Sequence, residues 1–164
     1  MKVKNRDMFK GDQIDGVIIT PLKKIADERG VIFHMMKSTD PQFTKFGEVY
    51  FTSGYPEVIK AWHIHKEMTI NDCCIVGMVK LVAYDVREGS VTKGNCMEIF
   101  IGEHNYCIVQ IPPGVANGYK AYGEKMAIMA NCADMPHDQK ELIYIDPLKP
   151  KGYDINYNWS VVHG

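Results

Sequence analysis

The chain has 164 residues, enough for one domain with its own hydrophobic core, and its 46% hydrophobic and 24% charged residues are ordinary for a globular protein. A formal net charge of −1 gives no bulk electrostatic attraction to nucleic acid or to an anionic membrane, so we expect neither as a partner. There is no apolar run of about 18 residues, as a membrane span needs, and the first residues lack the apolar core of a secretory signal. The 5 cysteines show no C-x-x-C spacing, which argues against a disulfide framework or zinc cluster and favours a cytoplasmic location.

Short apolar runs follow one another along the chain and are separated by Gly, Pro, Asn and Asp, which predicts an all-β sandwich or barrel. The strands expected in chain order are 16–20, 31–35, 47–52, 58–65, 73–85, 97–101, 106–111 and 125–131. The best helix candidate is 40–46, with at most two turns. We expect a single domain over 1–164, with a core at about 14–148 and a tail at about 149–164 that wraps the domain surface or a partner subunit.

The strand expected at 47–52 alternates cleanly. Glu48, Tyr50 and Thr52 share one face, and Val49 and Phe51 share the other. An acid, a phenol and a hydroxyl inside a barrel are unusual for packing alone and normal for a ligand cavity. We therefore expect this face to line a binding site.

The strand expected at 58–65 carries two histidines. Strict alternation places His63 and His65 on one face, together with Ala61 and Ile59. Two imidazoles among apolar neighbours suit proton transfer or metal binding. The alternative is a pair of structural histidines satisfied by hydrogen bonds.

The order of several motifs resembles the dTDP-4-dehydrorhamnose 3,5-epimerase family. These motifs are D-E-R-G at 27–30, K-A-W-H at 60–63, Y-D-V-R at 84–87 with S-V-T-K-G at 90–94, I-P-P-G-V-A-N-G-Y at 111–119, N-C-A-D at 131–134 and I-D-P at 145–147. The resemblance covers about 14–148 in one order. It implies a cupin-type double-stranded β-helix, that is a jelly-roll barrel, and a homodimer whose terminal strands help close the partner's site.

The resemblance also implies roles for individual residues. His63 is the general base, and Asp146 orients and charges its imidazole. Lys60 and Arg29 bind the nucleotide diphosphate. Removal of a proton beside the ketone gives an enolate, and His65, on the same predicted strand face as His63, is available to stabilise the enolate oxygen. The substrate is a nucleotide-linked 4-keto-6-deoxy sugar, and no cofactor is required because the ketone stabilises the carbanion.

Other residues that we expect at the site receive supporting roles. Tyr50 is a candidate proton donor. Glu48, Asn117 and Tyr119 are expected to contact substrate.

The chain departs from the family pattern at important places. The tyrosine acid of the family is replaced by Met135 and Pro136, and Asn117 stands where the family has a histidine. The family's lysine falls within 69–71, where the sequence is T-I-N. We therefore expect a phenol elsewhere to donate the proton, with Tyr50, Tyr119 and Tyr122 as candidates, or inversion of one carbon, more readily carbon 3 than carbon 5. A third option is a different reaction on a keto sugar.

Two other functions stay open at this point. A metal-dependent small cupin, an isomerase or a dioxygenase, would use His63 and His65 as ligands, but Glu67 lies too close behind them and Asn117 occupies the place of the late ligand. A non-catalytic sugar-nucleotide-binding module would explain the missing tyrosine. The leading hypothesis is a cofactor-independent epimerase that abstracts a proton with His63.

Overall fold

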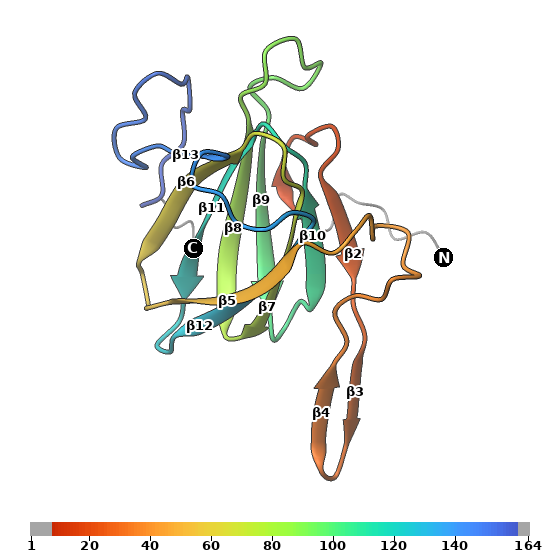
Figure 1. Ribbon diagram of the computed structural model, residues 1–164. Coiled ribbons are helices and arrows are strands. Elements are labelled where there is room, and N and C mark those ends of the chain that lie inside the picture. The colour runs from red at the N-terminus through yellow and green to blue at the C-terminus, as the bar shows by residue number, and fades with distance from the viewer. Residues whose placement is uncertain (1–7, 161–164) are drawn as a thin grey trace.

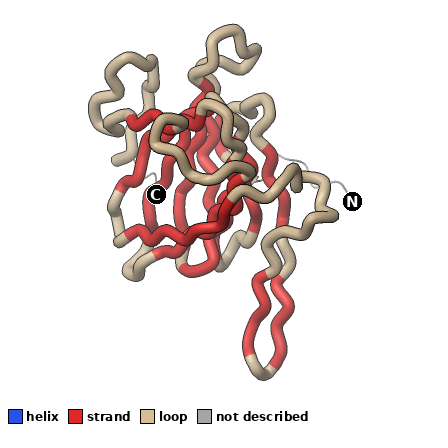
Figure 2. The backbone as a smooth tube through the Cα atoms, in the orientation of Figure 1, coloured by secondary structure: helices blue, strands red, loops and turns tan. Residues whose placement is uncertain are grey.

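The computed structural model describes residues 8–160, and every regular element in that range is a β-strand (Figures 1 and 2). One sheet has six strands in the order β1 (Lys10–Gly11), β9 (Cys96–Gly102), β8 (Met78–Asp85), β11 (Val115–Tyr122), β6 (Ile59–His65) and β13 (Leu142–Tyr144). The second has five strands in the order β2 (Ile18–Pro21), β10 (Cys107–Ile111), β7 (Ile70–Val76), β12 (Ala127–Ala133) and β5 (Glu48–Gly54). All pairings are antiparallel, and the sheets face each other as a jelly-roll barrel, which confirms the predicted fold class.

The barrel interior is filled on one side and hollow on the other. We call the region around β8, β9 and β10 the packed side, because its inward side chains are fully buried aliphatic groups. Leu81, Ile99 and Val109 are examples, each at most 1% exposed. We call the region around β5, β6 and β13 the open side. There the two sheets end in the edge strands β5 and β13, and polar side chains line a cavity.

The outer face of the six-stranded sheet is covered by the end of the chain. Trp62 and Ile64 of β6 point outward into a second apolar cluster, together with Tyr84 of β8. Trp159 lies over them, 2% exposed, with its ring centroid 5.0 Å from that of Trp62. The tail as far as residue 160 thus packs on the surface of its own domain.

Strand β6 does not alternate as the sequence predicted. Its register with β11 shifts by one residue, because His63 pairs with Asn117 whereas Ala61 pairs with Gly118. A side chain at Gly118 would meet Ala61 Cβ at 2.2 Å, so this close approach requires glycine.

The shift changes which side chains of β6 face inward. Ile59 and Ala61 pack on the outer cluster, so the prediction that they share a face with His63 was wrong. Lys60 instead faces the cavity beside His63. A β-bulge of this kind resets the alternation of a strand, and periodicity alone does not reveal it.

Three other expectations about secondary structure need correction. Residues 40–42 form a turn closed by the hydrogen bond from Phe43 N–H to Asp40 O, and residues 43–46 have no regular structure, so the expected helix is absent there. The run 73–85 is divided between two strands at Gly77, whose φ is 73°. Strand β11 was not expected as a strand, because its segment was interpreted only as a motif. Within residues 8–160 no helix is long and apolar enough to cross a membrane.

Strands β3 (Lys24–Asp27) and β4 (Gly30–Phe33) form a separate hairpin, which projects away from the barrel (Figure 1). The D-E-R-G motif is its turn. Gly30 has a φ of 143°, which glycine adopts readily, and the Asp27 carboxylate accepts the backbone N–H of Arg29 at 2.8 Å. The hairpin is the only two-stranded sheet in the described part of the chain.

Candidate active site

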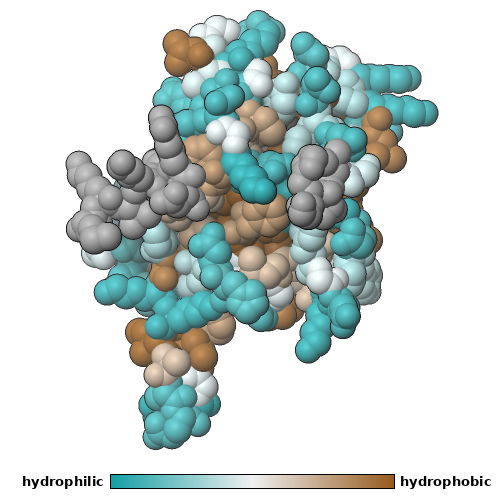
Figure 3. Space-filling view, turned by 180° about the vertical axis from the view of Figure 1, so that it is seen from behind, coloured by the Kyte–Doolittle hydropathy of each residue, from teal (hydrophilic) through white to brown (hydrophobic). Residues whose placement is uncertain are grey.

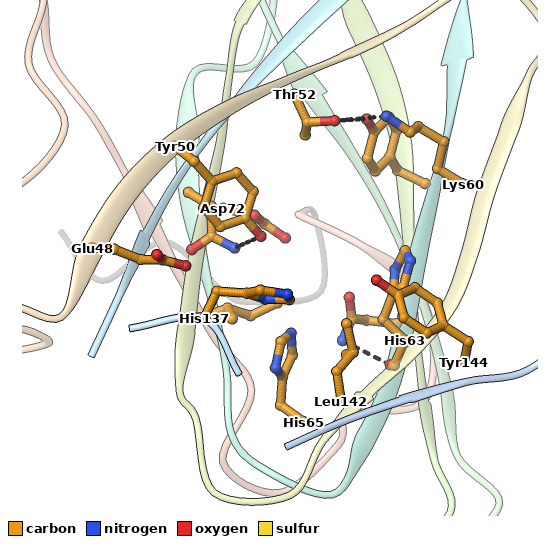
Figure 4. A pocket seen from close by; sticks show the side chains of 14 residues that line it. Glu48, Tyr50, Thr52, Lys60, His63, His65, Asp72, His137, Leu142 and Tyr144 are labelled. Carbon is orange, nitrogen blue, oxygen red and sulfur yellow. Dashed lines mark hydrogen bonds between the residues drawn. The ribbon is translucent and has the colours of Figure 1, made fainter. Parts of the chain in front are cut away.

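A cavity of about 440 Å³ occupies the open side of the barrel (Figure 4). Residues from both sheets and from the loop after β12 surround it. Its lining consists of Glu48, Tyr50, Thr52, Lys60, His63, His65, Ile70, Asp72, Asn117, Tyr119, Asn131, His137, Leu142 and Tyr144.

Most of the residues predicted for the site are brought together here. The prediction that Glu48, Tyr50 and Thr52 face inward is confirmed, while Val49 and Phe51 on the other face are exposed. The remaining predicted residues that line the cavity are His63, His65, Lys60, Asn117 and Tyr119. Arg29, Asp146 and the donor candidate Tyr122 do not line it.

His63 lies on the cavity wall with the edge of its ring against Tyr144, the ring centroids being 5.1 Å apart. Burial, and then the charges of His65 and Lys60, lower the pKa of His63 from 6.5 to about 4. The imidazole is therefore neutral near pH 7 and has a lone pair with which to accept a proton. This is the protonation state that a general base needs.

Asp146 does not support His63 as the sequence led us to expect. It is exposed, and its Oδ1 accepts the backbone N–H of Leu148 at 2.8 Å. No hydrogen bond joins it to His63 among the described residues. Strand β13 ends at Tyr144, opposite His63, and the chain then turns, so that Asp146 caps its own turn.

The histidine that contacts a carboxylate is His65. Its Nδ1 lies 2.8 Å from Oε2 of Glu141, and both side chains are less than a tenth exposed. The other oxygen of Glu141 accepts the backbone N–H groups of Glu67 and Met68 at 2.9 and 3.0 Å. The sequence analysis missed Glu141, because it lies in a loop and far from β6 along the chain.

The wall across from His63 carries acidic and phenolic groups (Figure 4). Burial raises the pKa of the Asp72 carboxyl from 3.8 to about 7. Burial, with the charge of Asp72, also raises the pKa of Tyr50, whose oxygen accepts the Asn131 side-chain N–H at 3.1 Å. Since its oxygen accepts this bond, the hydroxyl proton of Tyr50 remains available to a ligand.

Asp72 and His137 are site residues that the sequence analysis did not find. Asp72 shares a strand face with Ile70, so alternation along β7 would have indicated it if the strand had been expected to begin three residues earlier. His137 reaches the cavity from the loop after β12, two residues beyond Met135. A loop residue has no periodicity from which its direction is predictable.

Lys60 lies at the other end of the cavity from His65. Its ammonium group donates to Thr52 Oγ1 at 2.7 Å and to the carbonyl of Ser53 at 3.0 Å. The Tyr119 hydroxyl is 3.3 Å from the same Thr52 oxygen. Asn117 donates to the backbone carbonyl of His63 at 3.2 Å and so helps to fix β6.

The residues from 8 to 160 contain no group of three or more His, Cys, Asp or Glu side chains arranged to hold a metal ion. His63 and His65 share a wall, but one ring nitrogen of His65 contacts Glu141. Two histidines fall short of the three protein ligands of catalytic zinc sites.

The fold and the cavity together define a cupin-type barrel with a polar cavity between its two sheets. A family model described as dTDP-4-dehydrorhamnose 3,5-epimerase matches residues 12–162. The chain belongs to the dTDP-4-dehydrorhamnose 3,5-epimerase family, and it is an isomerase of the epimerase class.

Relatives and solved structures agree with this assignment. The chain is 33% identical over 153 residues to the spore coat polysaccharide biosynthesis protein SpsL of Bacillus subtilis, covering 90% of this chain and 97% of that protein. It is 32% identical over 130 residues to the probable low-salt glycan biosynthesis epimerase Agl13 of Haloferax volcanii, covering 78% and 83%. A dTDP sugar isomerase from Desulfovibrio desulfuricans superposes with a TM-score of 0.85 at 35% identity, covering 92% and 94% of the two chains.

Proposed function

We propose that the protein is a cofactor-independent epimerase of a nucleotide-linked 4-keto-6-deoxy sugar, and that it inverts carbon 3, carbon 5 or both. The observation that carries this proposal is a neutral, half-buried His63 on the wall of a polar cavity in a barrel of this family. The relatives lend support, since one is named as a probable epimerase of glycan biosynthesis and another as a polysaccharide biosynthesis protein.

The chemistry begins with the 4-keto group, which acidifies the hydrogens on carbons 3 and 5. His63 removes one of these protons, and the electron pair moves onto the ketone oxygen to give an enolate. An acid on the opposite face then returns a proton to the same carbon, while the ketone re-forms. No electrons leave the sugar, so no redox cofactor takes part.

The returning proton needs a donor across the cavity from His63. Tyr50 meets this requirement, because its oxygen already accepts a bond from Asn131 and its O–H is left for the substrate. His137 is a second candidate, since its ring extends into the cavity on the side of Glu48 (Figure 4). Histidine is a common general acid in enzymes, so the imidazole of His137 is chemically suited to deliver a proton.

Binding of the nucleotide diphosphate is assigned to Lys60 and to an arginine from a partner subunit. Lys60 is the only Lys or Arg that lines the cavity in the part of the chain described. Arg29, 83% exposed, lies in the turn between β3 and β4 and does not line the cavity of its own chain. The hairpin projects away from the barrel (Figure 1). A dimer that exchanges hairpins would carry Arg29 to the partner's site.

The surface of the hairpin supports such a dimer. Its apolar side chains Ile25, Val31 and Ile32 are 47–63% exposed. Figure 3 shows hydrophobic surface on the projecting hairpin, between the barrel and a hydrophilic tip. Exposed β-edges and apolar patches of this kind are normally covered by a partner. We expect a homodimer with two sites, and sedimentation as a monomer at micromolar concentration would count against it.

A sugar-nucleotide-binding module without turnover is the second candidate, because Met135 stands in the place of the family's tyrosine. Solvent-deuterium exchange into a panel of 4-keto sugar nucleotides, beginning with the dTDP-linked 4-keto-6-deoxy sugar, separates the possibilities. Incorporation of deuterium beside the ketone supports the epimerase. Binding without incorporation supports the module, and incorporation that is lost with a chelator and restored by a metal ion supports a metal-dependent enzyme.

A further inference from the structure

The enolate of the proposed reaction lacks an obvious cation. Negative charge develops on the ketone oxygen, and a positively charged or hydrogen-bond-donating group placed there lowers the barrier. Residues 69–71, where the family has a lysine, contain none, and Ile70 is the one of the three that lines the cavity. Lys60 is held at the far end of β6 by Thr52 and the carbonyl of Ser53.

The His65–Glu141 pair has the geometry to fill this gap. The Nδ1 to Oε2 distance of 2.8 Å is that of a charge-assisted hydrogen bond. The carboxylate is held on its other oxygen by the backbone N–H groups of Glu67 and Met68, so it cannot swing away from the ring. With Nδ1 bound to the carboxylate, Nε2 is the nitrogen left for the cavity, which the ring enters (Figure 4).

The charge state of Glu141 follows from the same contacts. Burial opposes its ionisation, but the hydrogen bonds from Glu67, Met68 and His65 outweigh burial and lower its pKa below 4.5. An ionised carboxylate on Nδ1 stabilises the imidazolium form of a histidine, as the aspartate of a catalytic triad does. In the imidazolium form both ring nitrogens carry a proton, so Nε2 is an N–H donor.

We propose that Glu141 is a positioning residue that keeps His65 as a cationic donor for the enolate oxygen, so that this pair replaces the missing lysine. The proposal rests on the proposed epimerase function. It also gives His63 and His65 different roles in the reaction. His65 is the cation, and its charge helps to keep His63 neutral as the base.

Besides Glu141, which is hydrogen-bonded to His65, other ionisable groups line the same cavity. They include His63 and Lys60 on β6, Asp72 on β7, Glu48 on β5 and His137 after β12. Only Glu141 is hydrogen-bonded to the ring in the described residues, so its removal is the decisive change.

The test uses the full-length protein with Glu141→Gln, which keeps the shape and one acceptor oxygen but removes the charge. Exposed Glu67→Gln is the matched control. We expect kcat for deuterium exchange to fall about ten- to a hundredfold with KM little changed, because the lost interaction forms only in the transition state. Glu141→Asp should recover part of the rate. Unchanged kcat in a folded Glu141→Gln variant would overturn the proposal.

A spectroscopic measurement on the wild-type protein keeps the proposal testable if the variant does not fold. We expect the ¹⁵N shifts of the His65 ring, assigned with His65→Asn, to show both nitrogens protonated at neutral pH. A neutral ring with one bare nitrogen would refute the inference, even if the wild-type enzyme exchanges deuterium. Absence of exchange in the wild type would instead refute the proposed function, whatever the state of His65.

Discussion

The packed and open sides of the barrel are both made from antiparallel strands, yet their interiors differ in polarity and in how completely side chains fill them. On the packed side, Leu81, Ile99 and Val109 leave almost no exposed area. On the open side, the inward positions of β5 and β6 carry an acid, a phenol and two imidazoles around about 440 Å³ of space. A loss of side-chain volume should therefore be costly on the packed side, while the open side has space for a ligand.

The difference shows that the residues that stabilise the fold and the ionisable residues of the candidate site lie on different sides of the barrel. The packed side supplies apolar burial, the dominant favourable term in folding. The open side holds partly buried ionisable groups, whose desolvation opposes folding and shifts their pKa values. Substitutions on the two sides should consequently change different measured quantities.

The largest effect is expected for His63→Asn on the open side. Loss of a positioned general base costs on the order of 10²–10⁴-fold in rate. Deuterium exchange into the 4-keto sugar should fall by this factor, while the circular dichroism spectrum and the thermal midpoint stay close to those of the wild type. A variant with near-normal exchange would remove His63 from the mechanism.

On the packed side, Leu81→Ala should lower the free energy of unfolding by about 2–5 kcal/mol, because it leaves a cavity in a fully buried region. Urea denaturation measures this change. Leu142→Ala on the half-buried cavity wall is the matched control and should cost less, since that side chain already borders open space. Equal losses in the two variants would contradict the contrast between the two sides.

The position of the proton donor should make the two reactive carbons unequal. Carbons 3 and 5 flank the ketone on opposite sides, and a misplacement of about 1 Å can cost roughly a hundredfold in rate. We expect carbon 3 to be inverted faster than carbon 5, as followed by proton NMR in deuterium oxide. Tyr50→Phe and His137→Gln identify the donor, and rapid inversion at both carbons would show that the missing tyrosine is fully replaced.

Asp72→Asn tests whether the open side opposes folding. The folded-state pKa of Asp72, about 7, lies above its ordinary 3.8, so the folded state binds more protons between these values and the stability contributed by the group is lost as pH rises through them. Above pH 7 the Asp72→Asn variant should be more stable than the wild type, because it removes the cost of burying an ionised carboxylate. We expect a gain on the order of 1–3 kcal/mol, which is less than the full pKa difference implies, because the carboxyl group keeps some contact with water.

The control for this measurement is the free energy of unfolding of both proteins, measured as a function of pH. His63 titrates in an overlapping range with the opposite sign, since its pKa is lowered from 6.5 to about 4 and its contribution is lost as pH falls. The difference between the wild-type and Asp72→Asn curves isolates Asp72. A difference that does not change between pH 4 and pH 8 would mean that Asp72 is not desolvated in the folded state.

The smallest effect is expected for Arg29→Ala, which should raise KM about tenfold through the loss of one charge-assisted contact and leave the free energy of unfolding within about 0.5 kcal/mol. Glu28→Ala at the same exposed turn is the control. Mixing Arg29→Ala and His63→Asn dimers should restore wild-type KM in hybrid dimers, because one site then has both His63 and the partner's arginine. No recovery on mixing would mean that Arg29 does not act across a dimer.

The sequence was sufficient for much of the fold and for part of the site. Short apolar runs between turn residues predicted an all-β barrel, because strands and turns are encoded locally. Alternation placed Glu48, Tyr50 and Thr52 on the cavity face of β5, where the strand is regular. The order of the motifs identified the family, which the comparison with known proteins then confirmed.

Tertiary structure alone decided what lies next to the two histidines. The shifted register opposite Gly118 turned Lys60 into the cavity and Ala61 out of it, since a bulge depends on a neighbouring strand. Glu141 reached His65 across 76 residues of sequence, whereas Asp146 capped its own turn. The pairing of a carboxylate with a histidine depends on distances between segments remote along the chain, and these are set only when the two sheets close around the cavity.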